Sequence, residues 1–196
     1  MKRNFLWIIG VMLSCCFAMT AVAACGDEDD ESLANGQSEV CIVGLLPTDI
    51  APYANLEMTY YDVQGMEKHL VVRHGESSDA LPSYAKEGLL LLQLTGGLTI
   101  DYSKNVVRTV RFVAPAGTKI TCKYRVVLNG EQPSTFPQKA YTPVAMVTGK
   151  RNNGEILITQ GTTQLSQKAL SSVEAFKSWL TAVQNRGESL SYVVAD

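Results

Sequence analysis

Five cysteines and two histidines are the residues of this 196-residue chain with the widest range of chemistry. Cysteine can carry a lipid or form a disulfide, and histidine can act as an acid, a base, a nucleophile or a metal ligand. Glu67 and His69 share one face of an expected strand, but a metal site needs a third ligand. Phosphate-binding loops, serine-hydrolase motifs and zinc-protease motifs are lacking. The sequence therefore predicts no metal site and no cofactor.

Arg73 and His74 stand where an apolar stretch ends in the sequence R-H-G-E-S. This stretch resembles the signature of the histidine phosphatase superfamily. The resemblance implies that His74 accepts a phosphoryl group and that Arg73 holds the phosphate. That family has a second catalytic histidine far downstream, whereas no histidine follows His74 here. We therefore expect no catalytic residues and a protein that is not an enzyme, and a phosphatase using His74 is the alternative.

Cys25 lies at the end of an N-terminal export signal. The first 24 residues form a basic start and an apolar stretch, and Val22-Ala23-Ala24-Cys25 resembles a bacterial lipobox. The resemblance implies that residues 1–24 are removed as a lipoprotein signal peptide and that Cys25 becomes the lipidated N-terminus. Cleavage by ordinary signal peptidase after Ala23 is the alternative. The membrane, reached through this lipid, is the first expected partner.

A run of acidic residues, Asp27–Glu31, follows Cys25 almost at once. Like charges repel one another and do not pack, so residues 25–39 are expected to form a solvated tether. The run resembles the surface-export signal of Bacteroidota-type lipoproteins. That resemblance implies a place on the cell surface, anchored in the outer membrane, and a plain spacer is the alternative.

The rest of the chain is nearly neutral. The chain has 17 basic and 19 acidic residues. Lys2 and Arg3 lie in the signal, and six acidic residues lie between positions 27 and 39, which leaves 15 basic and 13 acidic residues from Val40 onward. A nucleic-acid binder usually carries a basic excess, so no nucleic-acid partner is expected. The length suits a single folded domain over residues 40–196.

Two cysteines remain in this domain. Cys122 lies in Lys119–Leu128, where polar and apolar residues alternate, so a half-buried strand with Cys122 toward the core is predicted. Cys41 lies in another expected strand. In an oxidising compartment the two can form a disulfide, which would add roughly 4 kcal/mol of stability, or they can stay as two buried thiols. The sequence leaves both alternatives open.

The domain is expected to be mainly β. One helix is predicted near the C-terminus, opened by a capping box from Ser171 to Glu174, with Val173 and Phe176 on its apolar face. Asn55–Val63 and Met66–Arg73 should form a hairpin in which Gly65 takes a positive φ. The further expected strands are Leu89–Leu94, Val106–Val113, Val144–Thr148, Glu155–Thr159 and Ser191–Val194. This pattern predicts an antiparallel β-sandwich, Ig-like in its first part, with one C-terminal helix.

A lipid anchor and a β-rich domain without catalytic residues together favour a binding or assembly module of the cell envelope. Its expected partner is a glycan or a protein outside the cell. A structural or accessory lipoprotein that faces the periplasm is the alternative.

Overall fold

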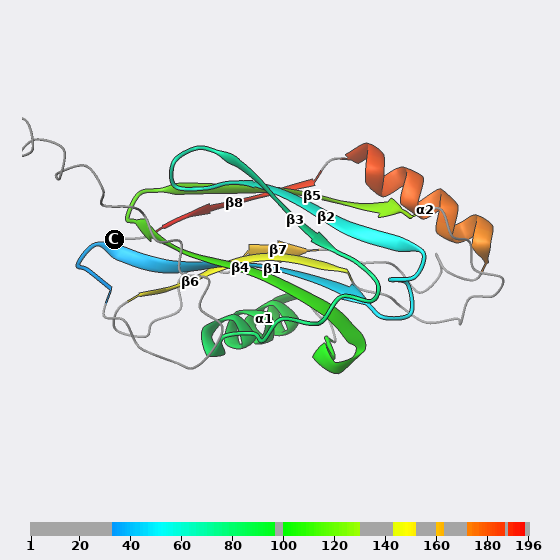
Figure 1. Cartoon of the computed structure of the whole chain (residues 1–196), viewed down its shortest axis with the longest axis horizontal. Helices are drawn as coiled ribbons and strands as arrows, with labels where there is room; N and C mark the ends of the chain where they lie inside the picture. The colour runs from blue at the N-terminus through cyan, green and yellow to red at the C-terminus, as the bar shows by residue number, and fades with distance from the viewer. Residues whose placement is uncertain are drawn as a thin grey trace, which may run out of the picture. The chain divides into compact units, whose positions relative to one another are not determined.

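The computed structural model describes residues 33–96, 100–129, 143–151, 160–162, 172–186 and 188–194. These residues form two antiparallel sheets that pack face to face, so the predicted mainly β sandwich is confirmed (Figure 1). The first sheet has the order β4 (Asn105–Pro115), β1 (Gln37–Pro47), β6 (Val144–Arg151) and β7 (Gln160–Thr162). The second sheet has the order β3 (Glu67–Val72), β2 (Ala54–Tyr61), β5 (Lys119–Leu128) and β8 (Glu188–Val193). The likeness to an Ig domain in the first part of the chain stays a prediction.

The main core lies between the two sheets. Val40 and Ile42 of β1 belong to the same buried cluster as Leu56 and Met58 of β2. Residues two apart on a strand point to the same face, so alternate positions of both strands supply this layer. The pairing within each sheet fixes the register, with Ile42 opposite Val110 on β4 and Val147 on β6. The interior is therefore built by side chains that alternation along the strands predicts.

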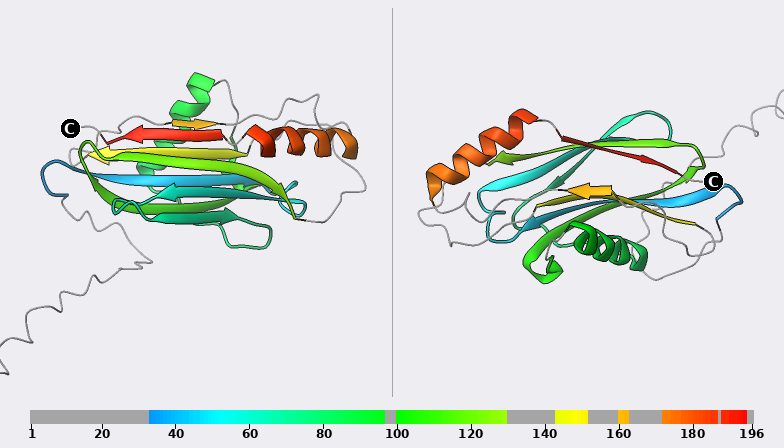
Figure 2. Two further views of the ribbon diagram at one scale, coloured as in Figure 1. Left: turned by 90° about the horizontal axis from the view of Figure 1, so that it is seen from above. Right: turned by 180° about the vertical axis from the view of Figure 1, so that it is seen from behind.

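A second buried layer lies on the other face of the first sheet, beneath the helix α1 (Ser83–Gly96) (Figures 1 and 2). Cys41 and Val43 of β1 pack there with Tyr84 and Leu89 of the helix. Strand β1 is thus buried on both faces from Val40 to Leu46. This explains why its sequence is a continuous apolar run rather than an alternating one.

Helix α1 corrects one expectation, because Leu89–Leu94 was predicted as a buried strand and is helical. A short apolar run does not distinguish a strand from a helix by its periodicity. The residues around it favour the helix: leucine, alanine, lysine and glutamate form helices well, and the run has no β-branched residue. The chain therefore has a second helix that the sequence interpretation missed.

The hairpin between β2 and β3 was predicted correctly. Gly65 has a φ of +74°, the left-handed conformation that favours glycine at such turns. The Asp62 carboxylate accepts hydrogen bonds from the backbone N–H groups of Gln64 and Met66, at 3.0 and 2.9 Å. An acidic side chain therefore holds the turn that sets the register of Tyr61 opposite Glu67.

The C-terminal helix α2 (Val173–Arg186) is present, but its cap is one residue later than predicted. The Ser172 hydroxyl accepts a hydrogen bond from the backbone N–H of Ala175 at 3.1 Å, which makes Ser172 the N-cap. Phe176 is fully buried and joins the main core, beside β5. Ser171 and the predicted strand Glu155–Thr159 lie outside the described residues, as do residues 1–32 with Cys25 and the acidic run.

Candidate functional site

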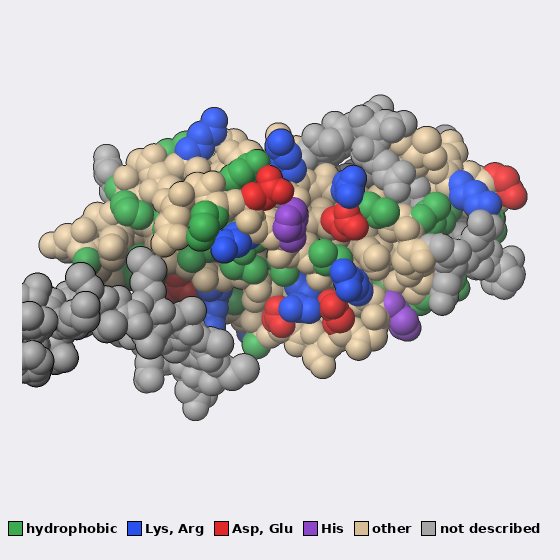
Figure 3. Space-filling model, turned by 45° about the horizontal axis from the view of Figure 1, so that its top comes forward, with side chains coloured by type: hydrophobic (Ala, Val, Ile, Leu, Met, Phe, Trp, Pro, Cys, Tyr) green, Lys and Arg blue, Asp and Glu red, His purple; other side chains and the backbone are tan. Residues whose placement is uncertain are grey.

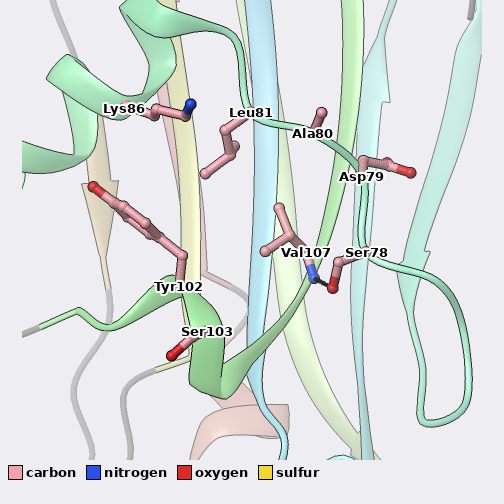
Figure 4. A pocket seen from close by; sticks show the side chains of 8 residues that line it. All are labelled: Ser78, Asp79, Ala80, Leu81, Lys86, Tyr102, Ser103 and Val107. Carbon is pink, nitrogen blue, oxygen red and sulfur yellow. Dashed lines mark hydrogen bonds between the residues drawn. The ribbon is translucent and has the colours of Figure 1, made fainter.

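A shallow pocket of about 350 Å³ opens where the segment after β3 meets the start of α1 (Figure 4). The short helix η1 (Tyr102–Lys104) borders it, and β4 forms part of its floor. Its lining residues are Ser78, Asp79, Ala80, Leu81, Lys86, Tyr102, Ser103 and Val107. Binding sites for small ligands are concave, mostly apolar and carry a few polar groups. This hollow is wide open to solvent, and it shares with such sites a mostly apolar lining and a few polar groups.

Ser78 and Asp79, which form one wall of the pocket, are fixed by hydrogen bonds to backbone groups of the edge strand β4. The Asp79 N–H donates to the Val107 carbonyl at 2.9 Å, and the Val107 N–H donates to the Ser78 hydroxyl at 3.1 Å. The Thr109 N–H donates to the Asp79 carboxylate at 2.7 Å. Residues 78 and 79 thus satisfy groups of an edge strand that would otherwise lack a partner. The same contacts hold the wall in place.

Arg108 reinforces this wall from β4. Its Nη1 atom lies 2.9 Å from Glu76 Oε2, and its Nε atom lies 3.3 Å from Asp79 Oδ2. All three side chains are about one-third exposed, so the pairs are partly screened by water. The consequence for the pocket is chemical, because the negative charge of Asp79 is already paired. Figure 4 shows its carboxylate turned away from Tyr102.

Most of the polar groups in the pocket are already engaged. The Ser78 hydroxyl accepts from Val107, and the Ser103 hydroxyl donates to Asp101 at 2.6 Å. Among the described residues, the Lys86 ammonium group and the Tyr102 hydroxyl have no hydrogen-bond or ion-pair partner. The groups left to meet a ligand are therefore one cation, one phenol and an apolar floor.

The R-H-G-E-S stretch forms the loop between β3 and this wall. Arg73 and His74 are exposed, and Gly75 turns the chain with a φ of +78°. Glu76 is the member of the stretch that contacts the wall, through Arg108. The only other histidine, His69, lies on β3 with its Nδ1 atom 3.2 Å from the Thr59 hydroxyl. The structure therefore gives the stretch a local structural role and places His69 in contacts of its own.

The outer face of the second sheet carries mixed charges (Figure 3). On it, His69 Nε2 lies 3.5 Å from Glu67 Oε1, and Arg125 Nη2 lies 2.7 Å from Glu57 Oε2. The Tyr61 hydroxyl donates to Glu67 at 3.0 Å, which raises the pKa of this tyrosine. In the part of the chain that the structure describes, no group of three or more His, Cys, Asp or Glu residues could hold a metal ion.

Cys41 and Cys122, the two cysteines of the folded domain, are not brought together, which corrects the disulfide alternative. Both thiols are free and buried. Cys41 faces α1 from the first sheet, whereas Cys122 faces the interior of the sandwich from the second sheet. The physical reason is parity: the odd positions of β1 between 41 and 45 point away from the second sheet. The alternation in β5 was interpreted correctly, but the face of β1 that carries Cys41 was not predictable from its apolar run.

We expect both thiols to be inert while the protein is folded. Burial raises the pKa of Cys41 and of Cys122 to about 12, so at pH 8 only about one thiol in ten thousand is the reactive thiolate. A maleimide reagent at pH 8 should label neither residue in the native protein and both after denaturation. The measurement is the mass of peptides after digestion. Labelling of native Cys41 within minutes would contradict the burial of its strand.

Helix α1 has a second notable feature, which is an exposed apolar surface. Leu90, Leu91 and Leu94 are 53%, 45% and 73% exposed. Leu94 lies four residues after Leu90 and three residues after Leu91, so the three side chains share the outer side of the helix. The inner side packs on the first sheet through Tyr84 and Leu89. The helix is therefore apolar on both sides, although only one side is covered by the described residues.

Sequence reasoning did not identify the pocket. Asp101 accepts hydrogen bonds from the N–H and hydroxyl of Ser103, a turn that its sequence could have signalled. Nothing in the local sequence brings Tyr102 and Lys86 into one pocket, because the two come together through the packing of α1 on β1 and β6.

Comparison with known proteins finds no family model, no curated protein and no solved structure that matches the chain. Within the described residues, no helix has the length and apolarity to cross a membrane.

Proposed function

We propose that this chain is a lipid-anchored protein of the outer membrane, exposed at the cell surface, whose β-sandwich is a binding module for a glycan. The anchor and the location are supported by the lipobox-like Val22–Cys25 and by the acidic run Asp27–Glu31. These two features support the location. The ligand class is supported by the pocket beside α1.

The observation that carries the glycan proposal is the composition of that pocket. The Tyr102 ring, Leu81 and Val107 line it, and the free polar groups stand at its border (Figure 4). A pyranose ring has an apolar face of C–H groups and a rim of hydroxyls. An aromatic side chain packs well against the apolar face, and polar side chains can bond the rim. The volume is at the lower end of the usual range for ligand pockets, so one or two sugar units would fit.

Binding should depend on Tyr102. We expect Tyr102→Ala to weaken binding of a monosaccharide about tenfold, which corresponds to roughly 1.4 kcal/mol of lost ring packing. The measurement is ligand-observed NMR of the full-length protein in detergent, titrated with a panel of neutral and acidic monosaccharides. Dissociation constants in the millimolar range are expected from so shallow a pocket.

The matched control is Tyr61→Ala, which removes a half-buried tyrosine from the outer face of the second sheet. It should bind the same sugars as the unaltered protein. If Tyr61→Ala weakens binding while Tyr102→Ala does not, the glycan site lies on the sheet face and the assignment to the pocket is wrong.

A non-enzymatic role is part of the proposal. His74 is exposed, and the other histidine is held on β3 by Thr59 and Glu67. A histidine nucleophile needs groups that position and stabilise the transferred phosphoryl group. Hydrolysis of a phosphomonoester by the purified protein that is lost in His74→Ala would instead support the phosphatase alternative.

A role in assembly with a protein partner is the second candidate function. The observation that favours it is the set of exposed leucines on α1, since large apolar side chains grouped on a surface are a common mark of interaction sites. Leu94→Gln separates the two candidates, because it changes the most exposed of these side chains and leaves the lining of the pocket intact. Unaltered sugar binding together with loss of a native complex would support assembly.

A further inference from the structure

We infer that the pocket beside α1 selects an acidic sugar, a pyranose that carries a carboxylate, over its neutral counterpart. This inference rests on the proposed glycan-binding function and names the ligand class for the same site. It is drawn from the polar groups that the pocket leaves unpaired, and from their charge.

Lys86 is the free charge of the pocket. Its side chain is exposed, reaches toward Leu81 over the apolar floor, and has no ion-pair partner among the described residues (Figure 4). The neighbouring lysine Lys104 differs, because its Nζ atom lies 3.2 Å from Asp101 Oδ2. The chain thus pairs one lysine near the pocket and leaves the other available.

Asp79, the one acidic residue in the lining of the pocket, is already occupied. Its carboxylate accepts hydrogen bonds from the Thr109 N–H and from Arg108, and Glu76 also pairs with Arg108. Glu87 follows Lys86 on the exposed surface of α1 and does not line the pocket. A ligand carboxylate in the pocket would therefore face the ammonium group of Lys86 and no unpaired acid of the lining. Charge-assisted hydrogen bonds of this kind are about twice as strong as neutral ones.

The start of helix α1 adds to the same preference. Lys86 lies in its first turn, which contains no acidic residue, and Pro82 before the helix has no side-chain acceptor to cap it. The N-terminal end of a helix carries a partial positive charge. Of this first turn, Lys86 lines the pocket, whose floor and aromatic ring suit the apolar face of a sugar.

The experiment compares galacturonic acid with galactose, which has the same ring without the carboxylate. The full-length protein in detergent is titrated with each sugar by ligand-observed NMR at low and high salt. We expect galacturonic acid to bind about tenfold more tightly at low salt, and we expect this preference to shrink at high salt because the ion pair is exposed and screened.

Three variants make the test specific. Lys86→Gln should bind both sugars equally, Lys86→Arg should keep the preference for the acid, and Lys104→Gln should behave as the unaltered protein. Equal binding of both sugars by the unaltered protein would overturn the inference and leave the glycan proposal standing. A preference that survives in Lys86→Gln would also overturn it. Binding of neither sugar would overturn both proposals.

Discussion

Replacing Phe176 with alanine is expected to lower the free energy of unfolding by about 3–5 kcal/mol. The ring is fully buried in the main core, beside β5, and is the side chain of α2 that the described residues place there. Removing it deletes a large apolar group and leaves a cavity that a β-sandwich cannot easily close. Equilibrium unfolding of the full-length protein in urea, followed by circular dichroism, measures the change.

Lys177→Ala is the control for this variant. Lys177 is the next residue of the same helix and is exposed, so its removal should change the stability by no more than about 0.5 kcal/mol. Below the unfolding midpoint, Phe176→Ala should bind sugars normally, because α2 does not line the pocket. A loss of stability below about 1 kcal/mol would show that Phe176 is not the residue that holds α2 to the sandwich.

The strands of this protein were easier to predict from the sequence than the elements against which each strand face packs. Alternation fixed the inward side of β5, including Cys122, because one face of that strand is core and the other is solvent. The same rule could not be applied to β1, which is buried on both faces. Which face of β1 meets the second sheet depends on the position of α1, and the leucine run of α1 gave no periodic signal.

The candidate site was even less predictable from the sequence than the faces of the strands. The sequence drew attention to His74, and the structure places it in an exposed loop. The pocket instead uses Asp79, Lys86 and Tyr102, which come from the segment after β3, from the start of α1 and from η1. Each is an ordinary surface residue by type. Their arrangement requires α1 to pack on the first sheet and residues 76–79 to bind the edge of β4, and these are tertiary events without a local signature.

Cys25→Ala is expected to abolish lipidation of the protein. A lipobox cysteine carries the diacylglycerol through its thiol, and alanine has no atom that can take its place. The cells are grown on a labelled fatty acid, and the label on the purified protein is counted before and after the substitution. We expect complete loss of the label.

Cys41→Ala is the matched control, because it removes another thiol but not the one at the signal junction. It should keep the label in full, although it can cost some stability within its buried layer. Label that persists in Cys25→Ala would contradict the lipobox assignment, and an unaltered protein that carries no label would favour ordinary cleavage after Ala23. Protease treatment of intact cells then tests the orientation: digestion of the unaltered protein supports exposure at the surface, and protection supports the periplasm-facing alternative. The pocket can meet a glycan outside the cell only in the first case, so the two experiments together decide whether the site and the location belong to one function.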